Sequence, residues 1–446
     1  MSDAFGVEIN KLLDSSVDDT TQTNDAGSES LSLSIILFYK YHPLSSSQDV
    51  MEPYRTAMEN LCQSLHLKGR ILLGCSENEG INGTLAGEQH NVRVFTWALL
   101  GPQHVQQHHN RTPLDEATSQ LLQEFWGKSQ EFVRAAGVPL LTMDSPDDFK
   151  WSSTTQHALF PDLVVKLVKE IIGTGGAFAS IPLEETSQGY LTPQQWHDEI
   201  LHLDPETTAL IDCRNTKECA VGHFPNALDP HTTTFAQFPQ WVKDHAPRLQ
   251  DKRVLMYCTG GIRCEKASTY LRRHGVHEVQ HLKGGIHKYL EHYGEEGLWK
   301  GKNFVFDGRC AASAAETQAG KDGNSDDGVS VAKEEETVVG KCFYCQSPYD
   351  TFHPHCVCTV CREPTLVCSP CQEHVEEYHC VNHFYLRTCY FTNLSRFSDD
   401  ELQRQLGELW YCSVELSPQT PPHYLRPAAQ HLLLVLRPSL ACLSFC

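Results

Sequence analysis

The stretch RVLMYCTGGIRCEKAS (residues 253–268) decides the fold of the middle of this chain. Its first five residues form a short apolar run that predicts a buried strand, and the residues from Cys264 onward predict a helix. Strands and helices also alternate on both sides of it, with strands TALIDCR (208–214) and EVQHLKGG (278–285) and helices LTPQQWHDEIL (191–201) and WVKDH (241–245). Strands separated by helices indicate a parallel sheet with helices on both faces. We therefore expect an α/β domain over residues 191–310.

Cys258 lies where the predicted strand ends and the predicted helix begins. Ligands of open α/β sheets bind at this carboxyl edge of the strands. Gly260 and Gly261 let backbone N–H groups turn inward and bind an anion, and the positive end of the helix faces the same point. These features favour a thiolate or a persulfide over a thiol. We predict that Cys258 is a catalytic nucleophile that carries sulfur, rather than a buried cysteine that only fills space.

The length of the loop after Cys258 indicates the kind of substrate. Arg263 closes the loop one residue sooner than the arginine of a cysteine-based phosphatase does, and the residues between are Thr259, Gly260, Gly261 and Ile262. The shorter loop fits one sulfur atom better than a tetrahedral phosphate. The expected donor is therefore a small sulfur compound such as thiosulfate, or a protein persulfide. Cys264 has two interpretations: it resolves a persulfide by forming a disulfide with Cys258, or it packs in the core.

Composition and charge restrict the class of protein. A chain of 446 residues suggests two or three domains. The longest apolar run, near LSLSIILFYKY (31–41), is too short and too interrupted to span a bilayer, and the acidic N-terminus lacks the pattern of a signal peptide. We expect a cytoplasmic protein without a membrane partner, with the nucleus as an alternative. The net charge of −20 disfavours a generally basic nucleic-acid binder, but much of the excess acid lies in residues 1–30 and 311–340.

The chain divides into segments of different composition. An α+β sandwich is expected where strand-like and helix-like runs alternate before residue 140, and the acidic stretches suggest disorder. The segments are an acidic disordered tail (1–31), the α+β domain (32–140), a connector with its own helix LVVKLVKEIIG (163–173) over 141–190, the α/β domain (191–310), an acidic linker (311–340), a Cys-rich module (341–392), and a C-terminal tail (393–446) that is partly helical through SDDELQRQLGELW (398–410).

The Cys-rich module has the spacing of a metal-binding domain. From Cys342 it reads C-x2-C-x10-C-x-C-x2-C-x6-C-x2-C-x8-C-x2-H, which contains four two-ligand pairs: Cys342/Cys345, Cys358/Cys361, Cys368/Cys371 and Cys380/His383. Four such pairs can supply two tetrahedral zinc sites, which are structural because protein ligands fill every position. Sequential and cross-braced pairing use the same residues, so both stay open. Cross-bracing would resemble a RING domain, whose spacing this module fits poorly.

Several motifs together resemble a known family. The loop CTGGIRCEKAS, the upstream IDCRNTKECAVGHFPNA (211–227) and the downstream LKGGI (282–286) resemble the rhodanese domain of the rhodanese-containing tRNA uridine hydroxylase (UPF0176) family. GRILLGCSENEGINGTLAG (69–87) resembles the N-terminal domain of that family, and FKWSS (149–153) and FPDLVVKLVKEII (160–172) are in register with it. The resemblance covers about residues 33–310 and implies an acylphosphatase-like N-terminal domain followed by a rhodanese domain.

The resemblance also implies roles for residues. It places the active cysteine on Cys258, with Arg263 closing the loop. A structural signature falls on Asp212, Arg214, Glu218, Gly222 and His223, of which Asp212 and Arg214 are expected to support the loop and Glu218 to pair locally. The loop Glu79–Thr84 either belongs to the substrate surface or is a tight hairpin. The cations available to RNA are Arg263, Lys266, Arg272, Arg273 and Lys283, for which a solvated helix face is the alternative.

Three functions are compatible with the sequence. The residues themselves favour a rhodanese-like sulfurtransferase that forms a persulfide on Cys258. The resemblance implies hydroxylation of the wobble uridine of tRNA through the same cysteine. The third possibility is a non-catalytic scaffold in which the rhodanese fold and the zinc module bind a partner, although a scaffold has no need of this intact loop.

Overall fold

The computed structural model describes residues 32–108, 114–156, 159–186, 188–318, 338–375 and 377–386. The chain forms two compact units, of which the first contains the residues up to Cys356 together with Arg362–His374, and the second contains Val357–Cys361 and the residues from Val375 onward. The predictions for the tail 1–31, for most of the acidic linker and for the helix at 398–410 fall outside the described residues. Within the described residues, no helix has the length and apolar character needed to cross a bilayer.

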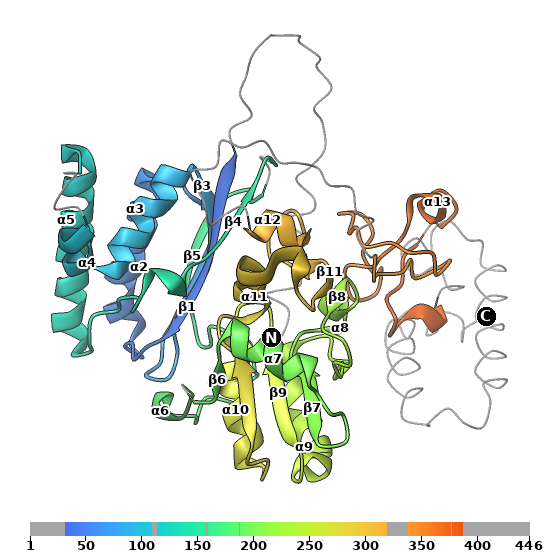
Figure 1. Ribbon diagram of the computed structural model, residues 1–446. Helices are drawn as coiled ribbons and strands as arrows, with labels where there is room; N and C mark the ends of the chain where they lie inside the picture. The colour runs from blue at the N-terminus through green and yellow to red at the C-terminus, as the bar shows by residue number, and fades with distance from the viewer. Residues whose placement is uncertain are drawn as a thin grey trace, which may run out of the picture. The chain divides into compact units, whose positions relative to one another are not determined.

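The N-terminal domain is a five-stranded mixed sheet with helices on one face (Figure 1). Its strands follow the order β4 (Lys150–Thr154), β1 (Leu33–Tyr41), β3 (Gly80–Gly87), β2 (Lys68–Gly74) and β5 (Leu163–Val168), and only β2 and β5 pair in parallel. The helices are α2 (Gln48–Ser64), α3 (Gln89–Leu100), α4 (Pro102–His108) and α5 (Glu116–Ala136). Ile36 and Phe38 belong to the core beneath these helices. Because side chains alternate along a strand, Leu37 and Tyr39 point to the opposite face.

The predicted α+β sandwich is confirmed, but it continues into the predicted connector. β4 and β5 complete the sheet, and the expected helix over 163–173 is wrong because Leu163–Val168 is a strand. The run LVVKLV is rich in β-branched residues, which fit a pleated surface. It pairs with β2 from Gly69↔Leu163 to Gly74↔Val168. An apolar run this short does not distinguish a strand from a buried helix by its pattern alone.

The second domain has the predicted parallel sheet. Its strands follow the order β6 (Tyr190–Leu191), β10 (Val279–Leu282), β9 (Arg253–Tyr257) and β7 (Thr208–Asp212), and every pair is parallel. Helices α9 (Phe238–Leu249) and α10 (Ile262–Arg273) contribute to the core on one face. Helices α7 (Pro193–Leu201) and α11 (Gly285–Tyr293) contribute to the core on the other. The start of α7 is fixed by a capping box between Thr192 and Gln195, with Pro193 in its first turn.

Short elements complete the described chain. The folded region continues past the predicted boundary at 310, since β13 pairs with β12 and α12 follows directly. These elements are α6 (Leu183–Thr186), α8 (Thr216–Cys219), β8 (Gly222–His223), β11 (Lys300–Gly301), β12 (Asn303–Phe304), β13 (Ala311–Ala312), α12 (Ala314–Gln318), α13 (Ser369–Gln372) and the 3-10 helices η1 (Pro146–Asp148), η2 (Phe235–Gln237), η3 (Gly294–Glu296) and η4 (Phe384–Leu386).

Candidate active site and metal centres

Cys258 directly follows β9 at the carboxyl edge of the parallel sheet, and α10 begins four residues later at Ile262. Gly261 is the N-cap of α10 and has a φ of 99°, a conformation that favours glycine. Its backbone N–H donates to the Cys258 Sγ at 3.2 Å. The predicted inward turn of the loop amides is therefore present at Gly261, and its acceptor is the cysteine sulfur itself.

The loop is also held from the start of α11. The backbone N–H groups of Ile286 and His287 donate to the carbonyl oxygens of Cys258 and Thr259, each at 3.0 Å. Gly285 has a φ of +67°, and a Cβ atom there would lie 2.7 Å from the Gly261 nitrogen and in closer contact with the Cys258 carbonyl oxygen. The second glycine of LKGGI is thus required by the close approach of two backbones.

The surroundings of Cys258 favour its thiolate. Burial raises the pKa of this thiol, but a hydrogen bond from the Cys264 thiol and the positive charge of Arg263 outweigh it, and the pKa falls to about 6. The backbone N–H groups of both neighbours lower it further. A cysteine with this pKa is mostly ionised near neutral pH, as a nucleophile requires.

Three cysteines lie on one face of the sheet. Asp212 pairs with Tyr257, so Cys213 and Cys258 are neighbours at the ends of β7 and β9. Both lie in the core cluster that also contains Cys264. Burial and the two neighbouring sulfurs raise the pKa of Cys264, so it stays protonated and donates to Cys258. Cys264 is fully buried in this core, and its thiol also stabilises the Cys258 thiolate.

The Arg263 side chain extends toward Glu218. Its guanidinium forms a two-pronged ion pair with Glu218, at 2.8 and 2.7 Å, and also donates to the Thr259 hydroxyl at 3.2 Å. Glu218 is fully buried, and Arg263 is 7% exposed. Glu218 accepts the local hydrogen bond that was expected, from the Asn215 backbone N–H at 3.0 Å, but its ion-pair partner Arg263 lies 45 residues away in the Cys258 loop. Arg263 therefore fixes the loop and supplies a positive charge beside the thiolate.

The other signature residues are structural. Asp212 and Arg214 are buried and pair at 2.7 Å, and Arg214 also donates to the Gly222 carbonyl oxygen at 2.6 Å. Gly222 pairs with Gly301 in the short sheet of β8 and β11, next to His223. Asp212 and Arg214 thus support the ends of the strands rather than the loop itself.

The open face of the N-terminal sheet lies against the active-site loop. A Cβ atom on Gly260 would lie 2.7 Å from Leu37 Cδ2, and one on Gly261 would lie 2.7 Å from the Tyr39 hydroxyl. The Tyr41 hydroxyl donates to the Ile262 carbonyl oxygen at 3.1 Å. β1 therefore covers the loop, and Cys258 is fully buried.

The predicted loop Glu79–Thr84 is not a loop, because Gly80–Thr84 lies in strand β3, and its interpretation as a tight hairpin is therefore wrong. Glu79 is 2% exposed, forms an ion pair with Lys266, and accepts the Ile171 backbone N–H at 2.7 Å. The interpretation of this loop as a substrate surface is therefore wrong at Glu79, because the carboxylate is buried between the two domains. Lys266, at 1% exposed, is also removed from the cations that could meet RNA.

The remaining candidate cations differ in their burial and in their hydrogen-bond or ion-pair partners. Arg263 is buried as described above, Arg272 donates to the Gln188 carbonyl oxygen at 2.9 Å, and Arg273 pairs with Glu185 at 2.8 Å. Lys283 is exposed, and its ammonium lies 6.0 Å from the centre of the Tyr190 ring. Lys283 follows β10 at the same sheet edge as Cys258.

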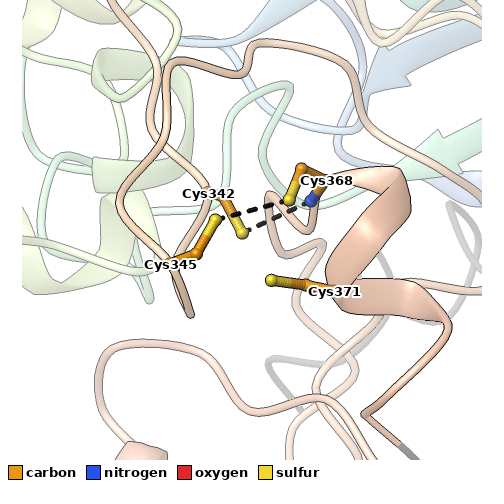
Figure 2. Close-up of side chains that lie close together, drawn as sticks. All are labelled: Cys342, Cys345, Cys368 and Cys371. Carbon is orange, nitrogen blue, oxygen red and sulfur yellow. Dashed lines mark hydrogen bonds between the residues drawn. The ribbon is translucent and has the colours of Figure 1, made fainter.

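The four predicted ligand pairs form two groups that can each hold a metal ion. Cys342, Cys345, Cys368 and Cys371 form one group, and their sulfurs turn toward a common centre in Figure 2. Cys358, Cys361, Cys380 and His383 form the other. In both groups all ligand atoms lie within 4.8 Å of one another. The pairing that the sequence left open is therefore interleaved, first pair with third and second with fourth.

The spacing of the ligand atoms fits tetrahedral coordination. The sulfurs of Cys345 and Cys368 are 3.4 Å apart, those of Cys361 and Cys380 are 3.6 Å apart, and His383 Nδ1 lies 3.2 Å from the Cys380 sulfur. A tetrahedral ion with bonds of about 2.3 Å to sulfur separates its sulfurs by about 3.8 Å. Cross-bracing is a feature of RING domains too, but the pairing alone does not indicate that activity.

Family models match three parts of the chain. The UPF0176 acylphosphatase like domain matches residues 33–171, the Rhodanese-like domain matches 194–292, and the Rhodanase C-terminal model matches 300–384. The first range includes β4 and β5, in agreement with the sheet.

Curated relatives match a large part of the chain. A protein named tRNA uridine(34) hydroxylase from Sinorhizobium fredii is 34% identical over 304 residues, which cover 68% of this chain and 76% of that protein. One of the same name from Rhizobium leguminosarum is 37% identical and covers 61% and 72%. Rhodanese-like domain-containing protein 6 from Arabidopsis thaliana is 28% identical and covers 78% and 52%. Among solved structures, the rhodanese-like domain of an Anabaena protein is 18% identical, covers 26% of this chain and 80% of that chain, and has a TM-score of 0.21.

Proposed function

Since the chain belongs to the UPF0176 family of proteins with an acylphosphatase-like and a rhodanese-like domain, we propose that it is an enzyme that hydroxylates uridine 34 of tRNA, with Cys258 as the nucleophile. The observation that carries this proposal is the joint match of both domains to relatives that bear that name. The contact between the two domains supports the proposed activity, because β1 of the N-terminal domain lies directly on the Cys258 loop of the rhodanese-like domain.

The test is the nucleoside composition of tRNA. Cells that lack this chain should lose a uridine at position 34 that carries one extra oxygen, and the wild-type chain should restore it. Cys258→Ser should not restore it, whereas Cys75→Ser, which changes a half-buried cysteine of the N-terminal domain, should. Retention of the modified nucleoside in cells without the chain would refute the proposal.

Sulfur transfer is the second candidate, and the environment of the Cys258 sulfur favours it. The N–H of Gly261 and the charge of Arg263 stabilise an anionic sulfur, which a persulfide also is. Thiosulfate or a protein persulfide would be the donor. Treatment of the full chain with thiosulfate should then add about 32 Da, one sulfur atom, to the peptide that contains Cys258. No gain at any donor concentration would exclude this candidate. If neither assay gives a signal while a stable complex purifies, a scaffold role remains.

Zinc is the metal that we propose for both cysteine groups. Three or four thiolates with at most one imidazole are a donor set typical of structural zinc, and the interleaved ligands would hold the module together without an open position for chemistry. We propose a cytoplasmic location for the same activity, as the sequence suggests, and fluorescence microscopy of the tagged chain tests it.

A further inference from the structure

Glu265 lies at the junction of three elements beside the active-site loop. It is on α10, next but one to Arg263, and is 7% exposed. Its Oε1 accepts a hydrogen bond from the Tyr39 hydroxyl of β1 and another from the Tyr190 hydroxyl of β6, both at 2.8 Å. The N-terminal domain therefore supplies one of the two donors, from a residue 226 positions away.

A short chain of contacts joins this carboxyl group to the reactive sulfur. The Tyr39 hydroxyl lies against Gly261, where a Cβ atom would be 2.7 Å away. The N–H of Gly261 in turn donates to the Cys258 sulfur at 3.2 Å. Glu265, Tyr39 and Cys258 thus share one small region covered by β1.

The groups around Glu265 keep the pKa of its carboxyl group near neutral pH. Burial raises its pKa to about 7, against the lowering effect of the two tyrosine hydroxyls and of Lys150, while the charge of Cys258 raises it further. Lys150 lies 4.4 Å from the centre of the Tyr39 ring, and burial lowers its own pKa to about 8. The next residue of the helix, Lys266, is already paired with Glu79. A group with a pKa near the working pH is best suited to accept and return a proton.

We propose that Glu265, held by Tyr39 and Tyr190, is the proton-transfer residue that works with Cys258 on the pyrimidine ring. This inference rests on the proposed uridine hydroxylation. C5 is the electron-rich carbon of uracil, where oxygen enters, and C6 is the electrophilic carbon that a thiolate attacks. Because β1 covers the loop, the base reaches Cys258 only when Leu37 withdraws from Gly260.

The proton-transfer step balances without an oxidant. The Cys258 thiolate forms a bond to C6, and C5 takes a proton from a water molecule on the face of the ring away from Glu265, which leaves a hydroxide ion. The Glu265 carboxylate then takes the original C5 hydrogen from its own face, the electron pair of that C–H bond restores the C5–C6 double bond, and the pair of the C6–S bond returns to Cys258 as thiolate. Glu265 passes this hydrogen to the hydroxide, so that the C5 hydrogen has exchanged with water. In hydroxylation oxygen enters on the face away from Glu265, and the same removal of the original C5 hydrogen releases the product.

The first test needs no RNA and uses the full chain. The rate at which iodoacetamide alkylates Cys258 is measured against pH by peptide mass spectrometry. In the wild-type protein the titration should be broad, because the thiol and the carboxyl ionise near 6 and near 7. Glu265→Gln removes a negative charge that opposes the thiolate, so the curve should sharpen and move to lower pH by up to about one unit. Glu291→Gln, which removes a buried carboxylate paired with Lys288, should leave the curve unchanged. If Glu265→Gln leaves the pH dependence of Cys258 alkylation unchanged, the electrostatic coupling between Glu265 and Cys258 is overturned.

The second test follows tritium at C5 of uridine 34 in tRNA. The wild-type chain should release tritium to water without an oxygen donor. Glu265→Gln should be about 100-fold slower, the size of a lost general base, and Tyr39→Phe should be intermediate. If the wild-type chain restores hydroxylation in cells but releases no tritium, the role of Glu265 in proton transfer is overturned, and the proposed uridine hydroxylation still stands. Failure of the cell assay would remove the function, and the alkylation curve would still decide whether Glu265 and Cys258 titrate together.

Discussion

Cys264→Ala is the variant that best measures what stabilises the Cys258 thiolate. The Cys264 thiol is the strongest of the groups that lower the pKa of Cys258 to about 6, against the effect of burial. A hydrogen bond to a charged group contributes about 1.5–3 kcal/mol, and each 1.36 kcal/mol corresponds to about one pKa unit. Alanine keeps nearly the same volume and removes the donor, so the pKa of Cys258 should rise to roughly 7–8.

The consequence is a change in the rate of alkylation. Near pH 7 roughly nine-tenths of Cys258 is thiolate in the wild-type protein, and the variant should have between about a tenth and a half. Alkylation by iodoacetamide should therefore slow by about 2-fold to 10-fold near pH 7. At alkaline pH, where both proteins are fully ionised, the two rates should converge.

Cys264→Ser is the matched control, because its hydroxyl also donates a hydrogen bond. It should keep the inflection near 6. The reasoning would be refuted if Cys264→Ala kept that inflection, or if the serine and alanine variants behaved alike. An unchanged inflection in Cys264→Ala would assign the low pKa to Arg263 and the backbone N–H groups, and like behaviour of the two variants would exclude the hydrogen bond as the contribution of Cys264.

Three further predictions concern the loop and the metal groups. Burial would raise the pKa of Glu218, but the charge and hydrogen bonds of Arg263 lower it from 4.5 to about 2. The pair therefore contributes about 3 kcal/mol to the free energy of unfolding above pH 4.5, and this contribution is lost as the pH falls toward 2. Glu218→Gln should lower the free energy of unfolding by about that amount near pH 7, with a gap that narrows in acid, and urea unfolding followed by tryptophan fluorescence measures it; an equal gap at every pH would contradict the linkage. Gly285→Ala should slow Cys258 alkylation and lower the Tm. The control is Gly175→Ala, since Gly175 has a similar φ of +65° but open space around a Cβ atom, and this change should cost only about 1–2 kcal/mol of backbone strain. Equal effects of the two changes would exclude the backbone contact at Gly285 as the cause. Cys342→Ser and Cys358→Ser should each remove one of two bound zinc ions in native mass spectrometry, and loss of both ions from either variant would mean that the groups do not fold independently.

Local sequence was sufficient to predict the α/β domain and the position of the Cys258 loop within it. The alternation of strands and helices around residues 253–268 predicted the parallel sheet, and the place of Cys258 at a strand end followed from it. The ligand pairs of the Cys-rich module were predictable too, since two cysteines separated by two residues can reach one ion from a single turn. These features depend on residues that are close along the chain, where geometry is nearly fixed by spacing.

Partners that are far apart in the sequence were decided only by the tertiary structure. The sequence left the pairing of the metal ligands open because each pair is locally the same, and the packing of the chain selected the interleaved order. The sequence did not predict the ion pair between Glu218 and Arg263 or the hydrogen bond from Tyr39 to Glu265. A buried charge pairs with whichever group the fold brings near it. The strand at Leu163–Val168 was missed for the same reason, since a short apolar run becomes a strand when an open sheet edge lies beside it. The sequence alone thus predicted which cysteine is the nucleophile, and the contact between two domains determined the groups that surround it.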